Sequence, residues 1–137
     1  MWDTRDPSTS WAVKTPAAVR ALSCAGHTVA VGCDDGSLLL LDARRSGRVF
    51  ASMTNAHEGP IASLSCLSHT AIVSGGRDDC VVKLWGADDA ALYPVGAPLL
   101  GHSSCVFSVA AQGDRVYSGG NDMIVRVWSL SEKPTAE

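Results

Sequence analysis

The sequence of 137 residues lacks the segments that mark membrane and secreted proteins. No stretch approaches the roughly 18 consecutive apolar residues that a membrane-spanning helix needs. The amino-terminal residues Met1–Asp6 contain no apolar region behind basic residues, so they do not resemble a secretory signal. We therefore expect a soluble protein of the cytoplasm or nucleus, with no membrane partner.

Paired cysteines are also missing. The five cysteines are odd in number and isolated, and no Cys-x-x-Cys pair occurs among Cys24, Cys33, Cys66, Cys80 and Cys105. This pattern argues against a disulfide framework or a zinc site and fits reduced thiols. We expect no metal and no cofactor.

A concentrated cationic surface is absent as well. Eleven basic and fourteen acidic residues give a net charge of −3, and the only basic cluster is Arg44, Arg45 and Arg48. Nucleic-acid-binding proteins usually carry a stronger patch, so we expect no nucleic-acid partner. A solvated loop is the preferred interpretation of these arginines over contact with an acidic partner.

The sequence does contain an internal repeat. Apolar segments that end at Leu41, Trp85 and Trp128 are spaced by 44 and 43 residues, and His57 recurs as His102 after 45 residues. Each segment follows a short turn that carries Asp, and another apolar segment precedes that turn. A period of this length is typical of repeated supersecondary units.

Short apolar segments separated by Gly, Asp, Asn, Ser and Pro predict an all-β chain with four strands, a to d, in each unit. We place the a strands at 18–24, 60–66 and 105–111, the b strands at 28–33, 70–75 and 114–119, the c strands at 37–42, 80–85 and 123–129, and the d strands at 48–53 and 95–100.

At these residues the chain resembles the WD40 repeat family, which implies β-propeller blades of four antiparallel strands. In that family, a His, a Ser or Thr on strand b, an Asp in the next turn and a Trp on strand c form a hydrogen-bonded tetrad. The resemblance assigns this tetrad in the third copy to His102, Ser118, Asp122 and Trp128. A buried carboxylate needs such donors, because burying it without hydrogen bonds is costly.

The other two copies follow the tetrad pattern less closely. The second copy offers His57, Ser74 and Trp85, with either Asp78 or Asp79 as the acid. The first copy keeps only Asp35, and the other three positions hold Thr15, Val31 and Leu41. We expect the first blade to depend on apolar packing and to be weaker.

The resemblance divides the chain into about three blade-equivalents. Residues 1–14 would hold the end of a strand c and a strand d, with that strand d near Trp11–Val13; 15–54 a degenerate blade; 55–100 a second blade; 101–130 a blade without its fourth strand; and 131–137 a tail. Since propellers usually close with four to eight blades, we expect a fragment of a longer propeller, a module completed by another chain, or an incorrect gene model. Self-association, in which two copies complete six blades, is a further hypothesis.

We expect no catalytic residues. His102, Ser118 and Asp122 are chemically a hydrolase set, but they belong to the repeated tetrad pattern. His27 and His69 occupy matching turns, which favours structural over metal-binding roles.

The function predicted is a non-enzymatic scaffold or adaptor that binds other proteins through its loops. The resemblance places most contacts on the d-to-a and b-to-c loops, which offer Asp34, Glu58, Arg77, Ser104 and Asn121. The alternative is the substrate-recognition part of a cullin-RING ubiquitin ligase, because Trp2-Asp3-Thr4-Arg5 resembles a box by which some family members dock to the ligase adaptor.

Overall fold

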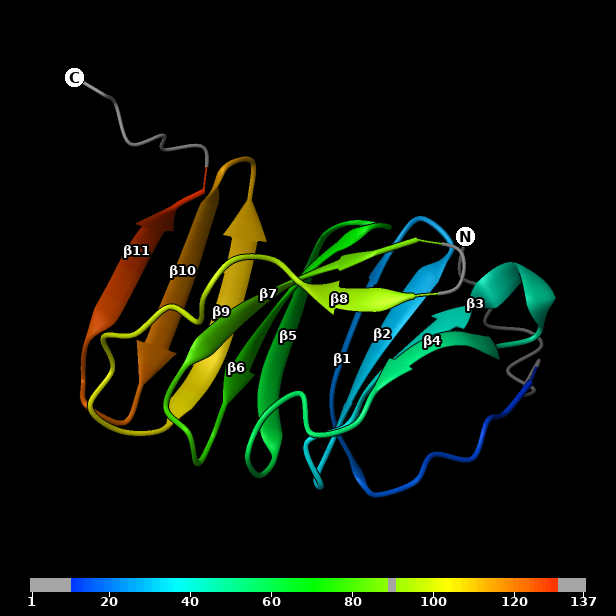
Figure 1. The fold of residues 1–137 in the computed structure, drawn as a ribbon, viewed down its shortest axis with the longest axis horizontal. Coiled ribbons are helices and arrows are strands. Elements are labelled where there is room, and N and C mark those ends of the chain that lie inside the picture. The colour runs from blue at the N-terminus through cyan, green and yellow to red at the C-terminus, as the bar shows by residue number, and fades with distance from the viewer. Residues whose placement is uncertain (1–10, 89–90, 131–137) are drawn as a thin grey trace, which may run out of the picture.

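The computed structural model describes residues 11–88 and 91–130, which form three antiparallel β-sheets (Figure 1). The first sheet contains β1 (Val19–Ala25), β2 (Thr28–Cys33), β3 (Leu38–Asp42) and β4 (Arg48–Met53), with a 3₁₀ turn, η1 (Ala43–Arg45), between β3 and β4. The second contains β5 (Ile61–Ser68), β6 (Ala71–Gly76), β7 (Val82–Ala87) and β8 (Leu92–Pro94). The third contains β9 (Val106–Gln112), β10 (Arg115–Gly120) and β11 (Val125–Ser129).

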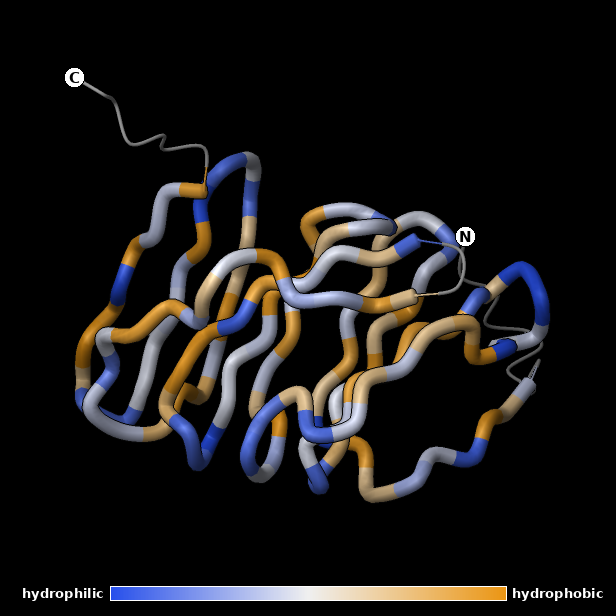
Figure 2. Tube along the Cα trace, viewed as in Figure 1, coloured by the Kyte–Doolittle hydropathy of each residue, from blue (hydrophilic) through white to orange (hydrophobic). Residues whose placement is uncertain are grey.

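Within each sheet the strands pair in the order in which they occur along the chain. The predicted all-β architecture of repeated four-stranded units is therefore confirmed, with three strands in the last unit among the described residues. Apolar residues follow the strands and hydrophilic residues gather at the turns (Figure 2). No helix in the described part of the chain is long and apolar enough to cross a membrane.

One predicted fourth strand was placed wrongly. The strand predicted at 95–100 lies at Leu92–Pro94 instead, and Leu99 forms only an isolated bridge with Val82. Gly96, with φ of 70°, turns the chain between these two pairings. Residues 11–13 are not part of the first sheet, and the strand c expected to pair with them would lie among residues 1–10, outside the described residues, so that strand d stays a prediction.

The three sheets stand side by side (Figure 1). Their apolar faces form the core. Leu38 and Leu40 of the first sheet pack with Ile61 and Ile72 of the second sheet. The other face of the first sheet packs against residues of the segment 11–17, including Trp11. The buried residues between the second and third sheets are Val73, Val82, Val106, Val109 and Val116.

Serine hydroxyls also join the neighbouring sheets. The Ser23 Oγ atom on β1 accepts a hydrogen bond from the Cys66 N–H on β5 at 3.0 Å. Ser65 on β5 accepts from the Ala111 N–H on β9 at 3.1 Å, and Ser63 accepts from Val109 at 3.0 Å. Ser23 and Ser65 occupy the same place in the repeated Leu-Ser-Cys segment, so the same contact joins both pairs of sheets.

The outward face of the third sheet repeats a face that is buried in the second. Val73 and Val82 are fully buried, whereas their counterparts Tyr117 and Val125 are 37% and 74% exposed. Val127 beside them is 52% exposed. The third sheet therefore presents an uncovered apolar face in the described structure.

Glycines at one repeated position allow the close approach of the sheets. A Cβ atom on Gly32 would lie 2.7 Å from Ile61 Cγ2, and one on Gly75 would lie 2.7 Å from Val106 Cγ1. Gly119 holds the same place in the third sheet, and a Cβ atom there would have nothing within 4 Å. Gly119 differs from Gly32 and Gly75 because no further sheet covers its face of the third sheet in the described structure.

The variant Gly75→Ala tests this packing. Its new methyl group would push Val106 and Val109 away, so we expect the free energy of unfolding to fall by about 1–3 kcal/mol. Gly119→Ala is the matched control, and its effect should stay within about 0.5 kcal/mol. Urea denaturation of the purified protein measures both variants, and equal losses would contradict the described sheet contacts.

Candidate functional site

A buried polar network crosses the second sheet. The His57 Nδ1 atom lies 2.9 Å from Asp79 Oδ2, and His57 Nε2 lies 2.6 Å from Ser74 Oγ. The Trp85 Nε1–H donates to the same Ser74 oxygen at 2.8 Å. Because a carboxylate only accepts, Nδ1 of His57 carries a proton, and in the neutral imidazole Nε2 accepts from the Ser74 hydroxyl. The network ties the loop before β5 to strands β6 and β7.

The third sheet repeats the network with the same atoms. His102 Nδ1 lies 3.0 Å from Asp122 Oδ2, and His102 Nε2 lies 2.8 Å from Ser118 Oγ. The Trp128 Nε1–H donates to Ser118 Oγ at 3.0 Å. The structure thus brings together all four residues that the resemblance assigned in this copy.

In the second sheet the acid of the network is Asp79, which settles the choice that the sequence left open. Asp79 also accepts from the backbone N–H of Glu58 at 3.1 Å, as Asp122 accepts from Ser103 at 2.9 Å. The carboxylate of Asp78 takes no part in the network and would meet a Cβ atom on Gly59 at 2.3 Å. Asp78 is therefore the extra residue of this turn.

The first sheet has no such network among its described residues. Val31 and Leu41 are buried in an apolar cluster, where the other sheets hold Ser and Trp. Asp35 is exposed and accepts from the Ser37 N–H at 3.0 Å, while the Thr15 hydroxyl donates to the Ala17 carbonyl. Apolar packing replaces the polar contacts in this sheet.

Two glycines that the sequence analysis did not single out make room for the His–Asp pairs. A Cβ atom on Gly76 would lie 1.9 Å from Asp79 Oδ1 and 2.4 Å from His57 Nδ1. A Cβ atom on Gly120 would lie 3.0 Å from His102 Nδ1. The first sheet has Cys33 at this position, where no His–Asp pair needs the space. The repeated Ser-Gly-Gly sequence was the available signal.

The network also stabilises the charged form of its carboxylates. Burial of Asp79 opposes ionisation, but hydrogen bonds from His57 and from the Glu58 and Val81 N–H groups outweigh it and hold the pKa of Asp79 below its ordinary value. Burial likewise opposes ionisation of Asp122, and the bonds from Ser103 and His102 outweigh it, so its pKa is also lowered.

The chemistry open to these residues is limited by their burial. Ser74 and Ser118 are buried, and each hydroxyl bonds to both a histidine and an indole. A nucleophilic serine must reach its substrate, so this arrangement supports a structural role for the two networks. Within the described residues, no group of three or more His, Cys, Asp or Glu side chains is placed to hold a metal ion.

Thiol chemistry has little support either. All five cysteines are free. Burial raises the pKa of the Cys33 thiol, and it does the same for Cys66. These thiols therefore stay neutral near pH 7, and the neutral form is the less reactive one.

The five predicted partner-binding residues lie in loops along one edge of the three sheets, the lower edge in Figure 1. Asn121 Nδ2 donates to Ser104 Oγ at 3.4 Å, so these two are adjacent. Asp34 forms an ion pair with Arg20 Nε at 2.7 Å. The side chain of Glu58 is exposed, although its N–H is held by Asp79.

Arg77 lies at a hollow that the sequence analysis did not foresee. The hollow has a volume of about 370 Å³ and is lined by Arg20, Pro60, Ala62, Arg77 and Phe107. Phe107 is 52% exposed although it lies on β9, and nothing in the residue pattern distinguished it from a buried strand residue. The segment Trp2–Arg5 lies outside the described residues, so the alternative ligase-docking role remains a prediction.

Removal of the Ser74 hydroxyl tests the contribution of the network. Ser74→Ala leaves His57 Nε2 and Trp85 Nε1 buried without a partner, so we expect the free energy of unfolding to fall by about 1–3 kcal/mol. Ser129→Ala, at an exposed strand position, is the control. If urea denaturation finds Ser74→Ala as stable as the control, the network does not stabilise the sheet.

Acid unfolding tests the lowered carboxylate pKa values. A carboxyl group whose pKa is lower in the folded state contributes stability above its ordinary pKa of about 3.8, and loses it as the pH falls through the folded-state value. We expect the free energy of unfolding to fall below about pH 4. The double variant Asp79→Asn/Asp122→Asn should show a shallower fall between pH 5 and pH 2; parallel curves would contradict the assignment.

Comparison with known proteins agrees with the repeat. The family model "WD domain, G-beta repeat" matches residues 48–86 and 94–129. The protein "Cell division cycle 20.1, cofactor of APC complex" from Arabidopsis thaliana is 28% identical over 138 residues, which cover 96% of this chain and 29% of that protein. "Ribosome biogenesis protein YTM1" from Eremothecium gossypii is 28% identical over 129 residues, which cover 84% of this chain and 27% of that protein.

A solved structure shares the fold. A chain in the crystal structure of the Mitotic Checkpoint Complex matches with a TM-score of 0.79 at 18% identity, over 96% of this chain and 44% of that chain. The present chain spans less than a third of the length of the two relatives. It belongs to the WD40 repeat family, and its three sheets are blades of that family's β-propeller fold.

Proposed function

We propose that this protein is a non-enzymatic scaffold that binds other proteins through the loop edge that carries Arg77. The observation that carries the proposal is the hollow at that edge, which combines two arginines with an exposed phenylalanine. Arginine and aromatic side chains are enriched in protein interfaces.

The frame beneath the hollow favours binding with little rearrangement. The Arg77 N–H donates to the Pro60 carbonyl at 3.0 Å. This hydrogen bond joins the loop after β6 to the loop before β5. Arg20 is held by Asp34. The network of His57 and Asp79 fixes the adjacent loop. Because these loops are already ordered by internal bonds, they would lose less conformational entropy when a partner binds.

The names of the relatives support the same class of function. One is named as a cofactor of the APC complex and the other as a ribosome biogenesis protein, and both names describe work within large assemblies. They also support action inside the cell. The buried Ser74 and Ser118 hydroxyls favour a structural over a hydrolytic use of the His-Ser-Asp sets.

Self-association remains a separate proposal, and the uncovered face of the third blade supports it. Tyr117, Val125 and Val127 would be buried if a further sheet packed there as the third blade packs on the second. In a dimer closed through this face, Gly119→Ala would weaken association, because its Cβ atom would then meet the covering sheet. A monomer at micromolar concentration would argue against such a dimer.

Quantitative affinity purification of the full-length protein tests the binding edge. The double variant Arg77→Glu/Phe107→Ser should lose its co-purifying proteins by at least about tenfold, because both the charge and the apolar contact of the hollow change. The double variant Lys14→Glu/Arg115→Glu, which changes exposed cations elsewhere, should keep them. Retention of every interaction by the first variant would contradict the proposal, provided that both variants unfold at the wild-type urea concentration.

A further inference from the structure

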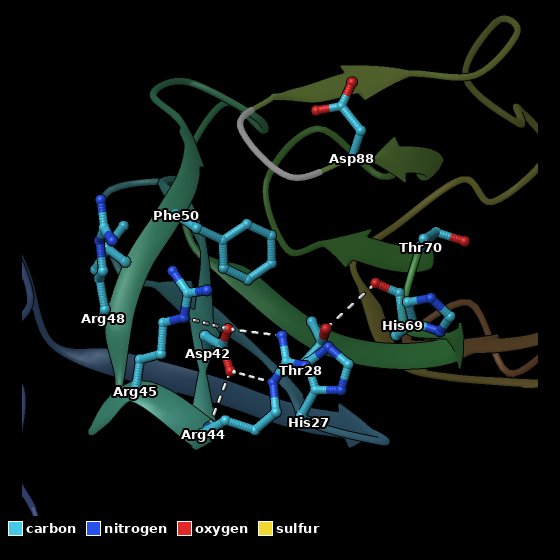
Figure 3. Close-up of a pocket in the computed structure, with 11 residues that line it drawn as sticks. His27, Thr28, Asp42, Arg44, Arg45, Arg48, Phe50, His69, Thr70 and Asp88 are labelled. Carbon is cyan, nitrogen blue, oxygen red and sulfur yellow. Dashed lines mark hydrogen bonds and ion pairs between the residues drawn. The ribbon is translucent and has the colours of Figure 1, made fainter.

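A second hollow, drawn in Figure 3, is lined by residues at the other ends of the strands of the first two blades, away from all of the predicted partner-binding residues. Its volume is about 400 Å³, and it extends between the turn after β1, the loop after β3, the turn after β5 and the end of β7. The residues that line it are His27, Thr28, Asp42, Arg44, Arg45, Arg48, Val49, Phe50, His69, Thr70 and Asp88.

The loop between β3 and β4, which carries Arg44 and Arg45, is held in place by Asp42. This buried carboxylate caps the turn η1 by accepting the Arg44 N–H at 2.9 Å, and it accepts the Arg44 Nε–H and Nη2–H at 3.1 Å each. Arg45 Nε lies 3.8 Å from the same group. In Figure 3 the Asp42 carboxylate lies between the two guanidinium groups. Hydrogen bonding to Arg44 lowers the pKa of Asp42 to about 2, so the carboxylate stays charged and keeps the loop fixed.

Backbone contacts order the same loop further. The Ala43 N–H donates to the His27 carbonyl at 2.8 Å, and the Gly47 N–H donates to the Asp42 carbonyl at 3.0 Å. Gly47 has φ of 77°, and a Cβ atom there would lie 2.4 Å from the Trp11 ring. The loop therefore presents its arginines from a tight and preformed turn.

The hollow carries a local excess of positive charge in a chain of net charge −3. Three arginines line it with only two acids, and one of those acids, Asp42, is already engaged by Arg44. Arg45 is 63% exposed, and Arg48 has no ion-pair partner among the described residues. Arg48 is therefore open to an anionic ligand, and so is Arg45, because its contact with Asp42 is long at 3.8 Å and leaves most of the side chain exposed.

Apolar and ring surfaces lie beside the charge. Val49 is 41% exposed, and Phe50 is partly exposed next to it. The rings of His27 and His69 lie with their centroids 5.7 Å apart. Guanidinium groups bind carboxylates through paired hydrogen bonds, and adjacent apolar surface favours a ligand with apolar side chains.

We propose that this hollow binds a short acidic peptide segment of a partner protein, with carboxylates at Arg45 and Arg48 and an apolar side chain against Val49 and Phe50. A nucleic acid fits less well, because its binding depends on many phosphate contacts, whereas the cations here are confined to one loop beside two acids. A small free anion would leave the apolar part unused. This surface is separate from the proposed binding edge at Arg77.

Fluorescence anisotropy with the full-length protein tests the proposal, with a labelled peptide of alternating glutamate and leucine residues as the probe. We expect saturable binding that weakens as the NaCl concentration rises. Arg45→Glu/Arg48→Glu should weaken binding by at least about tenfold, and Val49→Ser should weaken it by a smaller factor. Arg77→Glu/Phe107→Ser is the matched control at the other edge and should leave binding unchanged.

Several results would overturn the proposal. Among these are equal binding by the wild type and the Arg45→Glu/Arg48→Glu variant, or equal affinity for a peptide in which lysine replaces glutamate. Stronger binding of a single-stranded oligonucleotide than of the acidic peptide would assign the hollow to nucleic acid. Loss of peptide binding in Arg77→Glu/Phe107→Ser alone would move the acidic ligand to the other edge. Only the last of these results bears on binding at Arg77, and it would support a partner there. The other three concern the second hollow alone, so the two proposals fail separately.

Discussion

Each sheet in this structure has two apolar faces, and both must be covered by something other than water. The second sheet satisfies this constraint through Leu38 and Leu40 on one side and Val106 and Val109 on the other. The first sheet uses the segment 11–17 for its remaining face. The third sheet is covered on one side only in the described structure. The close sheet contacts, the glycines that permit them and the serine bonds between inner strands all serve this packing.

The buried polar networks supply specific hydrogen-bond geometry that apolar packing lacks. Apolar contacts alone would hold the sheets together, but the bonds from His57 and His102 fix the loops that precede β5 and β9 relative to the strands. The first blade shows that the fold can dispense with the network, because Val31 and Leu41 fill the same positions with apolar side chains. The loops next to His57 and His102, at the proposed binding edge, are thus ordered by buried side chains.

Much of the fold could be predicted from the sequence, because the turn residues and apolar segments recur at a nearly constant spacing that indicates where the strands lie. The acid of the second network could also have been found from its spacing, because Asp79 precedes Trp85 by six residues, as Asp122 precedes Trp128. Other features could not be predicted. The place of β8 depends on a turn at Gly96, and the two hollows arise from residues that meet only when separate turns converge. Arg45 was therefore interpreted as part of a solvated loop.

The blades form one stack in which each sheet is stabilised by its neighbours. Hydrogen–deuterium exchange of the full-length protein, followed strand by strand, tests this most directly. We expect the amides of β5, β6 and β7, which are covered on both faces, to exchange slowest, and those of β11, whose outward face is uncovered in the described structure, to exchange faster. Exchange of the second sheet at the rate of an exposed edge strand, or independent exchange of the three sheets, would contradict the account.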